Sequence, residues 1–397
     1  MNTHKYLLRL FLIILSGGVL FLSHHAASGE ENPPTKKIPD VQLNPLGMSP
    51  SAECGKCHKD IYKSWENSLH ARATNNPVFW AAFLQAHFKN VEVANNSCLR
   101  CHAPAAKFLY DFKLEKPLTR EGINCDFCHS ISSLEPAGSP SPYRHEFDLV
   151  KQGPLKNVES PVHRTRYNPL FKQSRFCAGC HELTTPGGTP LIETFSEWQQ
   201  GPYPAKGIHC QNCHMRKIPG KIVGEGIKQT PETEISSHDI AGGHSLSMRG
   251  ASLKLEIKDI RINKQKMEVV LDLTNVGAGH KIPTGLPSKK LMLRVGVQTT
   301  DGETIRVKEK IYHKHIVDSR GNLIDNDADL MLGRDLKMIF DNRIGPMERR
   351  REHFTFFVPH PQDKRVFARV FYIHNPQIIQ PMPIQIKMQE VTASPGQ

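Results

Sequence analysis

Apart from one run near its N-terminus, the sequence has no apolar stretch approaching the roughly 20 residues that span a bilayer. Aromatic residues make up only 7% of the 397 residues and are not interleaved with the basic ones, so no nucleic-acid partner is expected. No cysteine occurs after Cys213, so the C-terminal part of the chain offers no thiol to a covalent cofactor. A membrane span could therefore lie only near the N-terminus, and thiol chemistry only in the part of the chain up to Cys213.

The one apolar run, residues 10–22, lies in a segment built like a secretory signal. Lys5 and Arg9 precede the run, and small residues at 26–28 form a cleavage site. Because the run is short for a bilayer span, residues 1–28 are predicted to be a removable signal peptide rather than an anchor. The mature protein is then expected to be soluble and periplasmic, or exported beyond to the cell surface.

All ten cysteines lie in five Cys-x-x-Cys-His motifs. Two thiols at this spacing can add to the vinyl groups of one porphyrin, while the adjacent histidine supplies the proximal iron ligand. Zinc ribbons, thioredoxin-like redox pairs and disulfide frameworks do not explain a histidine after every pair. The sequence therefore predicts five covalently attached c-type haems. Their thiols would be Cys54 and Cys57, Cys98 and Cys101, Cys125 and Cys128, Cys177 and Cys180, and Cys210 and Cys213, and their proximal ligands His58, His102, His129, His181 and His214.

The formal net charge is +12, with 51 basic and 39 acidic residues. Haem propionates are expected to neutralise much of this excess. The run Arg349-Arg350-Arg351 is a candidate docking site for an acidic redox partner, although a solvated charged face is the simpler explanation.

The composition changes twice along the chain and predicts an α+β protein. Residues 29–50 are a proline-rich linker, and residues 51–249 are a mainly helical and loop-rich five-haem domain in which porphyrins replace an ordinary core. Two helices are expected there, over 59–73 and 78–88. Residues 250–392 alternate apolar and polar side chains in six or seven short strands, which predicts an antiparallel β-sandwich of immunoglobulin-like type.

The second axial position of each iron needs a further ligand, and histidine is abundant, with 21 residues. The surplus over the motif histidines favours mostly bis-histidine ligation. His280 would come from the β-domain and fix it to the haem region, and a hydrogen-bonding loop histidine is the alternative for His280 and His145. The candidate distal ligands are His70, His163, His238, His244, His280 and His145.

With these motifs in place, the haem region resembles multihaem c-type cytochromes of the cytochrome c-554 type. The resemblance implies periplasmic electron transfer through closely stacked haems, and it supports His70 as a distal ligand. The matching phrases are Cys54–His58 followed by Trp65, Ser68 and His70, then residues 121–130, 176–182, 197–198 and 207–215, and the Gly-His-x-x-Pro-Thr-Gly phrase at 279–285, which larger members carry in their β-sandwich.

Three functions remain open, and no catalytic residue is assigned. The first is electron transfer between periplasmic or membrane redox partners, such as a quinol-oxidising complex, other periplasmic or outer-membrane cytochromes, or a reductase. The second is reduction of nitrite, hydroxylamine or a sulfur oxyanion at one open haem, with His, Arg or Tyr nearby to handle protons. Pentahaem nitrite reductases typically hold their catalytic haem through a motif that ends in lysine, whereas all five motifs here end in histidine. The third is a structural or docking role in a larger cytochrome complex or filament.

Overall fold

The computed structural model describes residues 38–135, 141–185, 187–228, 230–374 and 382–396, which lie in one compact unit. The predicted signal peptide and the first part of the predicted linker fall outside the described residues. No helix in these described ranges is both long enough and apolar enough to cross a membrane.

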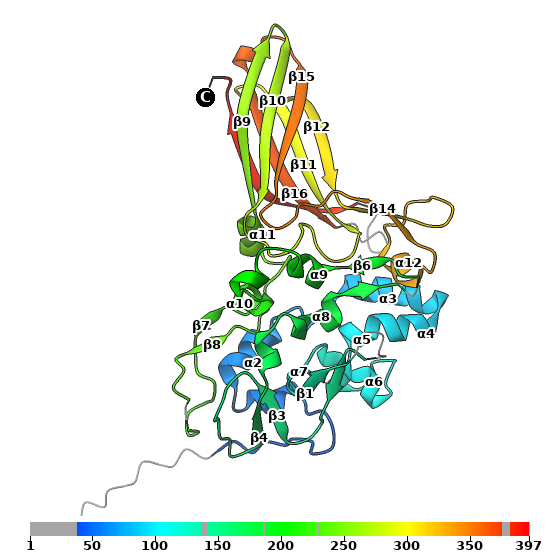
Figure 1. Ribbon diagram of the computed structural model, residues 1–397, viewed down its shortest axis with the longest axis vertical. Helices are drawn as coiled ribbons and strands as arrows, with labels where there is room; N and C mark the ends of the chain where they lie inside the picture. Colours follow the sequence, from blue (N-terminus) through cyan, green and yellow to red (C-terminus); the bar gives the residue numbers. More distant parts are fainter. Residues whose placement is uncertain (1–37, 136–140, 186, 229, 375–381, 397) are drawn as a thin grey trace, which may run out of the picture. The chain divides into compact units, whose positions relative to one another are not determined.

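The segment that carries the five motifs consists of short helices joined by turns (Figure 1). The predicted helix over 78–88 is confirmed. It starts there because Asn76 caps the helix and Pro77 occupies its first turn. The predicted helix over 59–73 ends earlier, at Glu66. The α-helices are α1 (Ser51–Gly55), α2 (Lys59–Glu66), α3 (Pro77–Lys89), α4 (Val91–Ala94), α5 (Arg100–His102), α6 (Ala105–Leu109), α7 (Cys125–His129), α8 (Arg175–His181), α9 (Thr194–Gln199) and α10 (Cys210–His214).

Between these helices lie four pairs of short strands, each strand two to four residues long, which were not predicted from the sequence. One pair is parallel and the other three are antiparallel. Such short strands make few apolar contacts, so they shape the loops between the motifs rather than forming a sheet core. The pairs are β1 (Ile131–Leu134) with β2 (Tyr143–His145), β3 (Val150–Gly153) with β4 (Arg164–Tyr167), β5 (Leu183–Thr184) with β6 (Pro190–Ile192), and β7 (Lys217–Pro219) with β8 (Glu234–Ser236).

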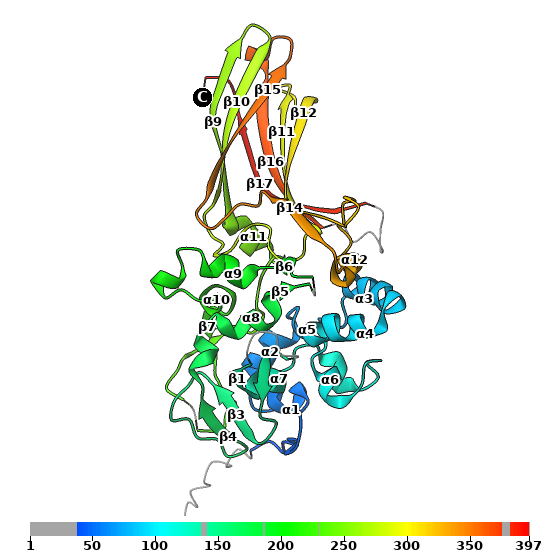
Figure 2. The same cartoon turned by 45° about the vertical axis from the view of Figure 1, so that its right-hand side comes forward.

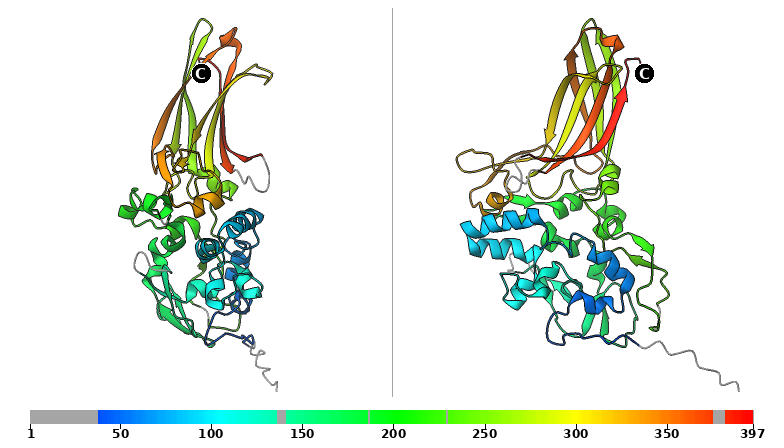
Figure 3. Two further views of the ribbon diagram at one scale, coloured as in Figure 1. Left: turned by 90° about the vertical axis from the view of Figure 1, so that its right-hand side faces the viewer. Right: turned by 180° about the vertical axis from the view of Figure 1, so that it is seen from behind.

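From residue 253 onward, long antiparallel strands form two sheets that pack face to face (Figures 2 and 3). One sheet has the order β15-β10-β9 and the other β12-β11-β16-β17. The six predicted strands are confirmed, while β13, β14 and β17 were not predicted. The elements are α11 (Leu246–Ser252), β9 (Leu253–Asn263), β10 (Lys266–Asn275), β11 (Lys289–Gln298), β12 (Thr304–Tyr312), β13 (Lys314–Val317), α12 (Asp327–Leu332), β14 (Lys337–Asp341), β15 (Arg349–Phe357), β16 (Arg365–His374) and β17 (Ile384–Ala393).

The largest buried apolar cluster lies between these two sheets. Alternate residues of β10 and β11, among them Leu271, Leu273, Leu291 and Leu293, are fully buried there. This is the burial expected of period-two strands that each present one face to a core. Among the described residues, helix makes up 27% and strand 31%, so the mixed α and β content is confirmed.

The run of three arginines lies on β15 and is already paired. Arg351 binds Asp272 through two contacts of 2.8 Å, and Arg350 forms an ion pair with Glu348. A solvated, internally paired face therefore accounts for this run.

Candidate haem-binding sites

The motifs are built on short helical turns. In α7, the whole motif from Cys125 to His129 is helical, and the Asn124 side chain caps it by accepting from the main-chain N–H of Phe127 at 2.7 Å. Residues three apart on a helix lie on one side, so both thiols of a motif face the same way. The helices α8 and α10 likewise end at their motif histidines, His181 and His214.

Cysteines from different motifs contact one another. Cys54 of the first motif lies within hydrogen-bonding reach of Cys125 of the third. Contact with Cys180 of the fourth motif lowers the pKa of Cys101, in the second, to about 7. The attachment points of the first and third motifs, and of the second and fourth, are therefore immediate neighbours.

The fourth motif also contacts the fifth. Contact with Cys177 lowers the pKa of Cys210 to about 7. Cys128 of the third motif is close enough to raise, through its charge, the pKa of Cys177 and Cys180, although cysteine contacts and burial raise them more. All five attachment points thus form one connected set, in which the fourth motif is the junction.

Three motif histidines face a second histidine at nearly the same spacing. The ring centres are 6.2 Å apart for His58 and His163, 6.3 Å for His70 and His181, and 6.3 Å for His214 and His280. An iron held about 2 Å from a nitrogen of each of two opposed imidazoles puts the ring centres roughly 6 Å apart. These pairs fit the axial ligands of a haem.

Hydrogen bonds also orient several of these rings. A histidine whose Nδ1–H donates to a main-chain carbonyl keeps the Nε2 lone pair for a metal. Each of the following histidines has Nδ1 within 2.6–3.1 Å of a carbonyl oxygen: His58 at Ile222, His129 at Gln152, His214 at Ala241, His163 at Arg164, His238 at Ser236 and His280 at Lys281.

Burial keeps the candidate ligands uncharged. It lowers the pKa of His70, His102 and His129 to about 4, and that of His181 to about 3. At neutral pH these imidazoles carry no proton on the metal-binding nitrogen, which is the form that ligates iron. The electrostatics of the site therefore fit the same cofactor as its geometry.

The second and third motifs differ from the other three. His238 forms no ring pair among the described residues, but its charge contributes, after burial, to the low pKa of His129. The charge of His58, of the first motif, acts on His238 as well. His102 instead has its ring contact with Phe79, with the ring centres 4.2 Å apart. Among the described residues, no histidine ring pairs with His102 at the 6.2–6.3 Å spacing.

The candidate distal histidines thus fall into two groups. His163, His70, His280 and His238 lie beside motif histidines, although His70 faces the fourth motif and not the first, near which the sequence put it. His145 is not brought against a motif histidine, and His244 lies near His214 without forming a ring pair with it.

Those two candidates have other surroundings. The ring of His145 packs against Phe127 and Phe147, and its Nδ1 lies 2.9 Å from the hydroxyl of Ser130. His244 is exposed. Its charge acts on His70 and the charge of His214 acts on it, yet its ring forms no pair among the described residues.

A buried ion cluster holds the loop that carries His280, and sequence reasoning missed it. Glu197, on α9, lies 2.7 Å from Arg343, and the two side chains are 3% and 2% exposed. Its other oxygen accepts from the main-chain N–H of Lys281 at 3.1 Å and from Thr284 at 2.9 Å. The segment containing Glu197 belongs to the family resemblance described above. Its partner Arg343 is more than 140 residues away in sequence, and no local pattern pointed to it.

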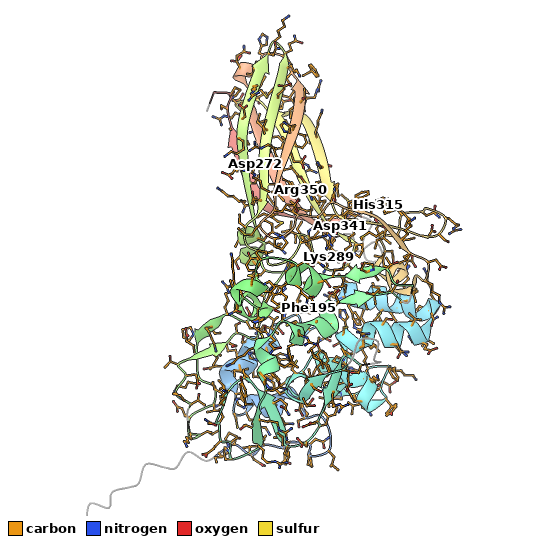
Figure 4. The ribbon with its side chains drawn as sticks, viewed as in Figure 1. Phe195, Asp272, Lys289, His315, Asp341 and Arg350 are labelled. Carbon is orange, nitrogen blue, oxygen red and sulfur yellow. The ribbon has the colours of Figure 1, made fainter. Side chains whose placement is uncertain are left out.

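Asp341 completes this cluster. It lies 2.8 Å from Arg343 and 2.8 Å from Lys281 (Asp341 is labelled in Figure 4). Burial opposes ionisation of this carboxyl, but the two cations outweigh burial and hold its pKa well below the usual range. The cluster fixes α9 to the β-domain immediately beside His280.

Comparisons with known proteins agree with this geometry. Residues 53–130 match the family described as cytochrome c554 and c-prime. These residues, which hold the first three motifs, are therefore similar to c-type cytochromes. No curated protein matches its sequence.

Among solved structures, the chain is similar to a penta-heme cytochrome c552 from Thermochromatium tepidum. The TM-score is 0.69 at 22% identity, over 88% of this chain and 100% of the other, and likeness at this identity shows a shared fold alone. A putative beta-galactosidase from Bacteroides fragilis also matches, at a TM-score of 0.17 and 12% identity, over 38% of this chain and 16% of that one. A similarity that weak says nothing about function.

Proposed function

We propose that this chain is an exported pentahaem cytochrome that carries electrons between periplasmic or membrane redox partners. The observation that carries the proposal is the contact between cysteines of different motifs, which links all five attachment points. The match of residues 53–130 to the cytochrome c554 and c-prime family supports electron transfer. A c-type haem, when bound, supplies reversible one-electron chemistry whose potential depends on its axial ligands and on burial.

The protein's own residues would set the order of the sites. The first motif neighbours the third, the third neighbours the fourth, and the fourth neighbours both the second and the fifth. Electrons would therefore enter or leave at the first, second and fifth sites, with the fourth as the branch point.

The axial ligands in this proposal follow the ring pairs. His163 would serve the first haem, His70 the fourth and His280 the fifth, since each ring lies 6.2–6.3 Å from the corresponding motif histidine. His238 would serve the third. Because His280 precedes β11 in the chain, the β-sandwich, of the predicted immunoglobulin-like type over residues 250–392, would complete the fifth site.

The test is a haem count together with an electron paramagnetic resonance spectrum of the oxidised holoprotein. Five covalent haems, mostly low-spin, and reversible uptake of five electrons in a potentiometric titration are expected. Fewer than five covalent haems, or a majority of high-spin iron, would contradict the proposal.

A reductase with one open haem is the second candidate, and the surroundings of His102 favour it. Among the described residues no histidine ring pairs with His102, and three ionisable residues of the β-domain lie near its motif. The Lys289 charge acts on His102, the Asp327 charge acts on Cys98 and His102, and His374 Nε2 lies 3.8 Å from Asp327. Such groups could deliver protons to a small ligand.

This candidate is tested by the same spectrum. One high-spin haem in five that becomes low-spin with cyanide, together with oxidation of the reduced protein by nitrite or hydroxylamine, would support it. Five low-spin haems without cyanide would contradict the reductase and leave electron transfer as the only candidate function.

A further inference from the structure

A cavity of about 430 Å³ opens beside the four-stranded sheet of the β-domain. Its polar lining is Lys290, His313 and His315, and its walls are aliphatic side chains such as Ile311 and Ile373. Small-molecule sites are typically concave and mostly apolar, with a few converging polar groups and volumes of about 300–1,000 Å³. The cavity matches this volume and lining but is open to solvent on one side, and neither haem attachment nor the buried ion cluster uses it.

The cavity lies on the outer face of the sheet. Leu291 and Tyr312 are fully buried on the inner face, and successive residues of a strand point to opposite faces. Lys290, on β11, and Ile311, on β12, therefore point outward. Because Ile373 lies directly opposite Lys290 on β16, all three side chains meet on that face.

The imidazoles of the cavity are held in place. His313 Nδ1 lies 3.0 Å from the carbonyl oxygen of Lys314, so it donates there and leaves Nε2 as an acceptor. The main-chain N–H of His313 donates to Asn342 at 2.7 Å. The His315 ring stacks on Phe340, with ring centres 4.9 Å apart (His315 is labelled in Figure 4).

Charge at the cavity favours a neutral imidazole beside a cation. Burial, and then the Lys290 ammonium, lower the pKa of His313. Lys290 itself lies 3.3 Å from Asp325, and both side chains are largely buried. The cavity thus presents a proton acceptor and a cation to whatever enters it.

The sheet connects this cavity to the second haem motif. One step along β11 from Lys290 is Lys289, which pairs across the sheet with His374. His374 Nε2 lies 3.8 Å from Asp327, the first residue of α12. Ala328 of α12 packs in the same apolar cluster as Phe79, whose ring stacks on His102. The cavity is therefore one strand position from residues beside the second haem.

We propose that this cavity binds a small planar hydroquinone that supplies electrons to the haems. The inference rests on the proposed function and names a class of donor for it. Aliphatic walls accept the ring, the two imidazoles accept hydroxyl protons, and the lysine stabilises the phenolate. Oxidation releases two protons, to His313 and His315, and two electrons, which reduce two ferric haems, and a quinone leaves.

Binding is tested first, in the oxidised holoprotein, by calorimetric titration with 1,4-naphthoquinone-2-sulfonate. Ile311→Trp fills the cavity, and His313→Leu removes an imidazole at similar volume. The matched controls are Val307→Trp, which adds the same bulk to the outer face of the same strand, and His353→Leu, at an exposed histidine of β15. We expect one site, at least tenfold weaker in both cavity variants and unchanged in both controls.

Electron delivery is tested second, by stopped-flow reduction of the haems with menadiol. The rate should saturate with menadiol concentration in the parent protein and rise linearly in Ile311→Trp, while reduction by dithionite stays the same. No binding to the parent, or equal binding to Ile311→Trp and Val307→Trp, would overturn the inference. If dithionite too fails to reduce the haems reversibly, the proposed electron transfer itself fails.

Discussion

Glu197 and Arg343 lie 2.7 Å apart, nearly excluded from solvent, and join the helix α9 to the β-domain. Glu197 also binds the loop that follows His280, through the main-chain N–H of Lys281. A contact between residues so distant in sequence therefore governs where the proposed ligand of the fifth haem lies.

Arg343→Gln should destabilise the holoprotein by about 3–5 kcal/mol, because removing one partner leaves Glu197 charged and buried. The measurement is the free energy of unfolding from guanidinium titration. Arg166→Gln is the control, since Arg166 pairs with Glu146 where both side chains are exposed, 53% and 40%, and should lose far less. Equal losses in the two variants would show that the buried pair has no special weight.

His280→Ala should convert one low-spin haem in five to high-spin, because the opposed imidazole 6.3 Å from His214 is lost. His280→Met should restore a sixth ligand and raise the potential of one haem. Electron paramagnetic resonance and potentiometry measure the two effects. His244→Ala is the control; a spin change there and none in His280→Ala would assign the ligand to His244.

Acid should weaken the ion cluster through Asp341. Arg343 and Lys281 hold the pKa of its carboxyl below the unfolded value of 3.8, despite burial. A carboxyl with a depressed folded pKa contributes stability above its unfolded pKa and loses it as pH falls toward the folded pKa. Stability should therefore fall below about pH 4, and Asp341→Asn should flatten this part of the profile. An unchanged profile, measured by guanidinium unfolding at each pH, would contradict the role of Asp341.

Gly122→Ala should disturb the fourth haem. Gly122 has a φ of +65°, and an added Cβ would come within 2.3 Å of the carbonyl oxygen of His70. The main chain of His70 must then move away from its place opposite His181. We expect altered low-spin signals from one haem, compared with Gly153→Ala, where a Cβ meets nothing within 4 Å. Identical spectra for both variants would argue against His70 as the ligand.

The sequence alone determined the chemistry of haem attachment and the kind of secondary structure in each half of the chain, helices in the first and strands in the second. Cys-x-x-Cys-His is a local pattern, so the five motifs could be read without knowing the fold. Period-two alternation predicted β9, β10, β11, β12, β15 and β16, because each buries one face in the core between the sheets. Strands such as β14, whose side chains are largely exposed, lack that alternation and were missed.

Only the tertiary structure decided which histidine faces which motif. His70 is near the first motif in sequence, yet its ring lies opposite His181 of the fourth. His280 and His214 are brought together by the cluster around Glu197, and His145 is turned instead into a group of phenylalanine rings. A covalent motif is encoded in five consecutive residues, whereas the ligand opposite it is set by packing between distant segments, which no local pattern records.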